Sequence, residues 1–215
     1  MPRNSPNRRL RDKVRFSRPL RLHKTRTGGE HVVNGFAEKL ELAKLSPEQF
    51  VQVLETLHML GETGAGIELS SLETEVLVDI VQRASREQLK AIADHRELRS
   101  AFLDEIFRRM SDHFAPERAS HVDFVVAWRF TDGDGEDGFD RFQTVIEDGV
   151  CVSSTDLART PDTTITLSVD DFIRMATGNA AVAAMFVTGK VKVKGEYAPA
   201  VRFSGYFDIP KPSGS

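Results

Sequence analysis

The sequence predicts an α+β fold in which a small all-helical region precedes a five-stranded, mainly antiparallel sheet covered by helices. The first observation is a change of spacing. Apolar residues recur about every 3.6 positions from Phe36 to Phe114, and every second position after Pro116. The second observation is that glycine-containing turns separate the extended segments, which is typical of hairpins.

Composition favours a soluble globular protein. The 215 residues are 40% hydrophobic and 28% charged, and this length can bury a sizeable core. We expect no transmembrane helix and no secretory signal, because no apolar run is long enough. A single cysteine, Cys151, excludes an internal disulfide and favours a reducing, cytoplasmic location. We interpret Cys151 as a buried strand residue and not as a nucleophile.

The N-terminus is strongly basic. Residues 1–26 carry ten basic side chains and one acid, whereas the rest of the chain has an excess of acids. Because this segment has few apolar residues, burial cannot offset the entropy lost on ordering it. We therefore expect a disordered basic arm over residues 1–35. An anionic partner such as nucleic acid or acidic lipid, a transit peptide and a merely solvated tail remain open.

Residues 36–96 are predicted to form a separate helical region. Its first helix has Ser46 as N-cap and Gln49 closing a capping box, and we expect Gly61 to end it. Ser70 and Ser85 are the expected starts of two further helices. An amphipathic helix over residues 97–114 then leads into the sheet, which we expect to belong to a second unit over residues 97–212.

The stretch TDGDGEDG, residues 131–138, fits the glycine pattern of a dinucleotide-binding turn. That site requires a helix after the glycines, yet residues 139–147 alternate like a strand, and the acids would repel a phosphate. A calcium loop fails as well, because Asp137 and Gln143 stand where glycine and glutamate are needed. The stretch is therefore predicted to be a hairpin connection.

No catalytic group of residues emerges from the rest of the chain. The six histidines lack metal-ligand spacing, and there is no G-x-S-x-G motif. Asp170 and Asp171 follow Ser168, a predicted N-cap, so we interpret them as complements of a helix dipole. We expect a protein that is not an enzyme and that uses no cofactor and no metal.

Two C-terminal stretches carry a family resemblance. The run TTITLSVDDFIRMATG and, ten residues later, TGKVKVKGEYAPAVRF resemble the sterol carrier protein 2 family of lipid-binding and lipid-transfer domains. The resemblance extends over roughly residues 98–210 and leaves residues 36–96 unexplained. Pro199, near the start of the last expected helix, departs from the small residue that is commoner there in the family.

The resemblance implies that the sheet and helices enclose an apolar tunnel for a fatty acyl chain, a sterol or a phospholipid, without covalent chemistry. The expected lining residues are Phe124, Val126, Trp128, Phe172, Met175, Met185, Phe186, Phe203 and Phe207. Each could instead be ordinary core. The alternative function is that of an adaptor, in which the helical region binds a protein partner and the basic arm binds an anionic one.

Overall fold

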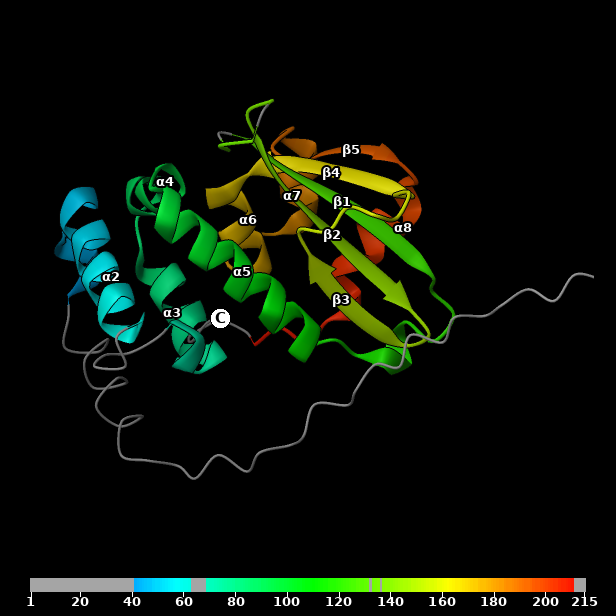
Figure 1. The fold of residues 1–215 in the computed structure, drawn as a ribbon, viewed down its shortest axis with the longest axis horizontal. Coiled ribbons are helices and arrows are strands. Elements are labelled where there is room, and N and C mark those ends of the chain that lie inside the picture. Colours follow the sequence, from blue (N-terminus) through cyan, green and yellow to red (C-terminus); the bar gives the residue numbers. More distant parts are fainter. Residues whose placement is uncertain (1–40, 63–68, 132, 136, 211–215) are drawn as a thin grey trace, which may run out of the picture.

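The structure, a computed structural model, describes residues 41–62, 69–131, 133–135 and 137–210. The predicted disordered arm lies outside these residues. Within these ranges, four α-helices precede the sheet: α2 (Pro47–Glu62), α3 (Thr74–Arg83), α4 (Arg86–Asp94) and α5 (Arg96–Asp112) (Figure 1). Short 3-10 turns flank them: η1 (Leu42–Lys44), η2 (Leu69–Ser71) and η3 (Pro116–Arg118).

Two helices start where the sequence predicts, α2 after Ser46 and α4 after Ser85. In α2 the Gln49 amide donates to Ser46 Oγ at 3.2 Å, and the Ser46 amide donates to Gln49 Oε1 at 3.0 Å. Ser85 and Gln88 form the same reciprocal box at the start of α4. These bonds satisfy amides that the helix itself cannot pair.

Two predicted helix boundaries were wrong. Ser70 does not begin α3 but lies in η2, and α3 starts at Thr74. The reason is tertiary, because the carbonyls of Leu69 and Leu72 accept hydrogen bonds from Arg109 on α5. In addition, Gly61 does not end α2, which continues to Glu62. A glycine inside a helix costs only about 1 kcal/mol, so it does not force an end.

The sheet has five strands: β1 (Phe124–Thr131), β2 (Phe139–Glu147), β3 (Val150–Ser154), β4 (Thr163–Ser168) and β5 (Lys192–Gly195). Their order is β3-β2-β1-β4-β5. The predicted mainly antiparallel sheet is confirmed, with one addition: β1 and β4 run parallel. The connection from β3 to β4 passes β2, where the Arg159 backbone exchanges two hydrogen bonds with the Gln143 side chain. This contact buries the polar side chain of Gln143.

The hairpin prediction for residues 131–138 is confirmed, since Thr131 pairs with Phe139 across β1 and β2. The glycines serve two purposes. Gly138 has a φ of +77°, whereas a Cβ on Gly135 would lie 2.1 Å from the Phe139 carbonyl oxygen. Only one of them is therefore needed for positive φ, and Gly135 is needed for space.

Four short helical elements complete the fold: α6 (Val169–Ala176), α7 (Val182–Val187), α8 (Tyr197–Arg202) and η4 (Phe203–Tyr206). Ser168 caps α6 as predicted and accepts from the Asp171 amide. Helix α7 has Ala181 as its N-cap residue, without a side-chain capping bond. Pro199 lies in the first turn of α8, where its missing N–H has no helical partner to lose.

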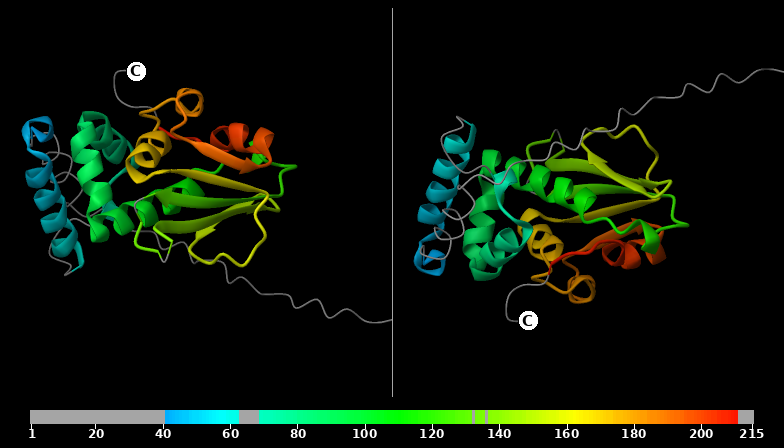
Figure 2. Two further views of the ribbon diagram at one scale, coloured as in Figure 1. Left: turned by 90° about the horizontal axis from the view of Figure 1, so that it is seen from above. Right: turned by 90° about the horizontal axis from the view of Figure 1, so that it is seen from below.

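One hydrophobic core extends from the N-terminal helices to the sheet. The two views in Figure 2 place α2 outermost, with α3 and α4 between it and the rest of the fold. Helix α5 packs against α4 and η2 as well as against β3 and α6. Its Phe107 ring stacks on Phe142 of β2 at 4.5 Å between centroids, and it also meets Phe172 of α6 at 5.1 Å.

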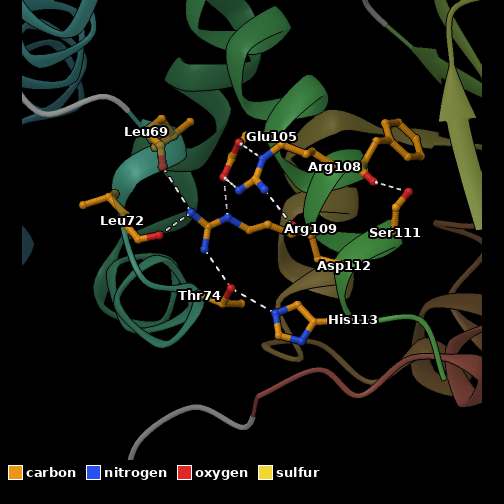
Figure 3. A network of polar contacts seen from close by, with 10 residues as sticks. Leu69, Leu72, Thr74, Glu105, Arg108, Arg109, Ser111, Asp112 and His113 are labelled. Atoms are coloured by element: carbon orange, nitrogen blue, oxygen red, sulfur yellow. Dashed lines mark hydrogen bonds and ion pairs between the residues drawn. The ribbon is translucent and has the colours of Figure 1, made fainter. Parts of the chain in front are cut away.

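A buried ion pair on α5 fastens the N-terminal helices to the sheet unit (Figure 3). Arg109 donates from Nε to Glu105 at 2.6 Å, and its other nitrogens donate to the Leu69 and Leu72 carbonyls and to Thr74 Oγ1. Both charged side chains are more than nine-tenths buried. The division into residues 36–96 and 97–212 stays a prediction, and this network lies across it.

Candidate functional site

An apolar cavity lies between the helix-covered face of the sheet and the C-terminal helices. Its volume is about 40 Å³. Ser204 alone contributes a polar side chain to its wall. The lining residues are Met110, Trp128, Ile165, Phe172, Met175, Ala176, Val182, Phe186, Val191, Ala200, Phe203, Ser204, Phe207 and Ile209.

The indole N–H of Trp128 points away from the cavity, which keeps this part of the wall apolar. Trp128 Nε1 donates to Thr144 Oγ1 on β2 at 2.9 Å, and Thr144 shares a further hydrogen bond with Ser153 on β3. The Trp128 ring lies 5.3 Å from Phe172 and 5.5 Å from Phe203, measured between centroids. The indole is therefore held in one orientation with its ring among the aromatic side chains that line the cavity.

Six of the nine predicted lining residues border this cavity: Trp128, Phe172, Met175, Phe186, Phe203 and Phe207. Three do not. Phe124 and Val126 precede Trp128 on the same strand face and are buried in the core. Met185 is also buried, but Val182 and Phe186, four residues apart on α7, share the side that faces the cavity.

Several lining residues were missed by sequence reasoning. The four-residue spacing from Phe186 could have identified Val182. Ile165 lies beside Trp128 only because β4 pairs in parallel with β1, and that register has no local sequence signal. Met110 at the end of α5 and Ile209 after η4 come from distant parts of the chain.

Helices α7 and α8 form the roof of the cavity, and few of their side chains are buried. Each of α7 and α8 has one buried residue, Met185 and Ala200 respectively. Phe186 and Tyr197 join the two helices edge to face, with centroids 5.7 Å apart. Below the roof, Lys190 Nζ lies 2.7 Å and 3.0 Å from the Asp171 carboxylate oxygens. Asp171 therefore forms an ion pair besides complementing the α6 dipole.

The cavity is smaller than a lipid requires. A water molecule occupies about 30 Å³ of liquid, and ligand pockets usually measure about 300–1,000 Å³. The enclosed space in this conformation therefore suits one water-sized group. Accommodating an acyl chain requires outward movement of the roof, where α7 and α8 bury few side chains.

A larger open cleft, of about 830 Å³, lies between the start of α5 and the β1–β2 turn. Its buried arginine, Arg99, already has partners. It donates from Nε to Asp140 at 2.8 Å and from Nη1 to the Ala93 carbonyl at 2.9 Å, and it also pairs with Asp134. Since its buried cation is satisfied within the protein, this cleft offers less to a ligand than the apolar cavity does.

The described residues provide little for catalysis. Cys151 is 5% exposed, and burial raises the pKa of its thiol to about 12, which keeps it protonated and unreactive. No group of three or more histidine, cysteine, aspartate or glutamate side chains within the described ranges could hold a metal. Over the same residues, no helix is both long and apolar enough to cross a membrane.

Comparison with known proteins assigns the sheet unit. Residues 103–208 match the SCP-2 sterol transfer family. The C-terminal half of the chain is a domain of this family. The bovine (Bos taurus) hydroxysteroid dehydrogenase-like protein 2 is 27% identical over 104 residues, 48% of this chain and 24% of that protein. The matched part thus spans about a quarter of that relative.

Solved structures with similar folds have low sequence identity. A palmitated SCP2L2 from Aedes aegypti is 15% identical, with 48% of this chain and 88% of that chain covered and a TM-score of 0.40. Sterol carrier protein 2 from Yarrowia lipolytica is 23% identical, with coverages of 45% and 88% and a TM-score of 0.35. The inverting sec-alkylsulfatase Pisa1 from Pseudomonas sp. is 16% identical, with coverages of 86% and 32% and a TM-score of 0.44.

Proposed function

We propose that the SCP-2 domain binds and transfers a hydrophobic ligand, a fatty acyl chain, a sterol or a phospholipid, in its apolar cavity without covalent chemistry. One observation carries the proposal. Of the side chains that line the cavity, only Ser204 is polar, so the wall complements an aliphatic surface and leaves a charged group unsolvated. The family of the domain supports the same function.

The ligand enters, in this proposal, by displacing the roof. Helices α7 and α8 each bury one side chain, whereas the sheet and α6 hold the fixed wall with Trp128 and Phe172. Met175 lines the cavity from the fixed helix α6 and Phe186 lines it from the moving helix α7, both with flexible or rotatable apolar groups. A roof of this kind accepts ligands of different lengths, because the cavity expands with the ligand.

The test is displacement of a fluorescent fatty acid by palmitate, cholesterol or a phospholipid. We expect saturable binding at micromolar levels, about −8 kcal/mol. Val182→Trp fills the cavity from α7 and should weaken binding at least tenfold. Val187→Trp is the matched control, because Val187 is on the same helix but 88% exposed. Absence of saturable binding for every lipid class would refute the proposal.

A second candidate function, recruitment of a protein partner by the helical region, is favoured by one observation. Met59 and Leu60 at the end of α2 are 59% and 42% exposed. Replacing both with serine should abolish a specific complex while leaving lipid binding unchanged. A complex that survives the double replacement would argue against this surface. The cytoplasmic location and the role of the basic arm also stay predictions.

A further inference from the structure

A second small cavity adjoins the apolar cavity described above. Its volume is about 30 Å³, compared with about 40 Å³ for the first. Three side chains line both spaces: Met110 of α5, Ala176 at the end of α6, and Ile209 after η4. The two cavities are therefore neighbours that one layer of side chains separates. We call the second one the rear compartment and these three side chains the partition.

The far wall of the rear compartment comes from outside the SCP-2 domain. Leu77 and Val78 of α3 line it, and they are 2% and 1% exposed. Helix α3 belongs to the helical region that precedes the matched residues 103–208. Asn179, just after α6, ties this helix to the sheet unit, because its side-chain amide donates to the Val78 carbonyl at 3.2 Å. A helix outside the family match thus closes this end of the apolar interior.

The polar side chains around the rear compartment are bonded to one another or to the backbone. His113 Nε2 lies 3.0 Å from Thr74 Oγ1, which also accepts a hydrogen bond from Arg109 at 2.8 Å (Figure 3). Thr177 donates to the Ile173 carbonyl at 2.7 Å. The other side chains of the wall are apolar. The compartment therefore suits the apolar end of a ligand and not a charged headgroup.

The partition can open for a narrow group. Met110 is unbranched, so its side chain can rotate without a change in the backbone. Ala176 adds only a methyl group, and Ile209 lies outside any helix or strand. A single acyl chain therefore needs little more than rotation of Met110. A fused ring system is wider, and its passage requires the packed helices α5 and α6 to separate.

We propose that the rear compartment receives the methyl end of a long acyl chain, and that Leu77 and Val78 set the longest chain that fits. This inference rests on the proposed function and deepens it, because it selects a straight acyl chain from the ligand classes named there. Joining the two cavities lengthens the path of the chain beyond the space under α7 and α8. The inference also gives a function to α3, which the family resemblance left unexplained.

The experiment measures binding of saturated fatty acids to the full chain by displacement of a fluorescent fatty acid. For acids of about 10 to about 20 carbons, affinity should rise about fourfold with each buried methylene until the chain end meets α3. Val78→Ala enlarges the rear compartment. Val81→Ala is the matched control, because Val81 is a valine of the same helix, is 3% exposed and lines neither of the two cavities.

In Val78→Ala the rise should continue for about one further methylene, which is a gain of about fourfold for the longest chains. Chains too short to reach α3 should bind as they do to the unchanged protein. Val81→Ala should lower the melting temperature to a similar extent and keep the original dependence on chain length. Val78→Phe narrows the compartment and should weaken binding by about fourfold or more, for long chains only.

An unaltered dependence on chain length in Val78→Ala would overturn this inference but not the proposed function, since fatty acids would still bind. Absence of binding at every chain length would instead remove the proposed function and this inference with it. Cholesterol tests the choice of ligand class, because its binding should gain nothing from Val78→Ala or Val81→Ala. A gain for cholesterol in Val78→Ala alone would contradict an acyl chain as the occupant.

Discussion

The buried ion pair of α5 provides a quantitative test of how the two parts of the chain are joined. Glu105→Gln keeps the size and hydrogen-bonding shape of the side chain but removes its charge. Arg109, 7% exposed, then retains the Leu69 and Leu72 carbonyls and Thr74 but has no counter-charge. Breaking a buried pair from one side usually costs about 3–5 kcal/mol.

We expect the lower end of that range, about 3 kcal/mol, because the carbonyl oxygens still solvate Arg109 in part. For a protein of this size, 1 kcal/mol lowers the melting temperature by about 2–4 °C, so the loss should be about 6–12 °C. Thermal unfolding followed by circular dichroism measures it. The matched control is Asp94→Asn, which breaks the exposed pair with Lys90 at the same spacing and should cost less than about 1 kcal/mol.

The same pair predicts how stability depends on pH. Burial tends to raise the pKa of Glu105, but its bonds and charge interactions with Arg108 and Arg109 outweigh this and hold the pKa below the ordinary 4.5. The contribution of the ion pair to the free energy of unfolding is therefore present above that value and is lost as the pH falls through the lowered pKa.

A Glu105→Gln protein as stable as the Asp94→Asn control would refute the role assigned to the pair.

Three further predictions follow from single positions. Cys151 should resist iodoacetamide at pH 8 in the native protein and react only on unfolding; fast native labelling would contradict its burial. Met185→Trp should cost about 1–3 kcal/mol by overpacking, measured by urea unfolding, and a neutral effect would mean that Met185 borders open space. Gly135→Val should lower the melting temperature, since its Cβ would meet the Phe139 carbonyl, and calorimetry should find no binding of NAD or ATP in either protein.

The local elements could be predicted from the sequence. The capping boxes at Ser46 and Ser85 and the cap at Ser168 depend on neighbours three positions away, and the hairpin at residues 131–138 joins two strands that follow each other in the chain. Period and turn chemistry specify such features before any packing occurs. The family resemblance likewise rested on short motifs in a fixed order, and residues 103–208 confirm it.

Packing decided what no local pattern contains. Arg109 draws the carbonyls of Leu69 and Leu72 out of a helix, and therefore α3 starts later than Ser70 suggests. The parallel pairing of β4 with β1 places Ile165 beside Trp128 in the cavity wall. Met185 and Phe186 are adjacent and both apolar, yet only Phe186 reaches the cavity. Sequence determined which side chains are apolar, and the tertiary arrangement decided which of them enclose space, because a cavity is bounded by elements far apart in the chain.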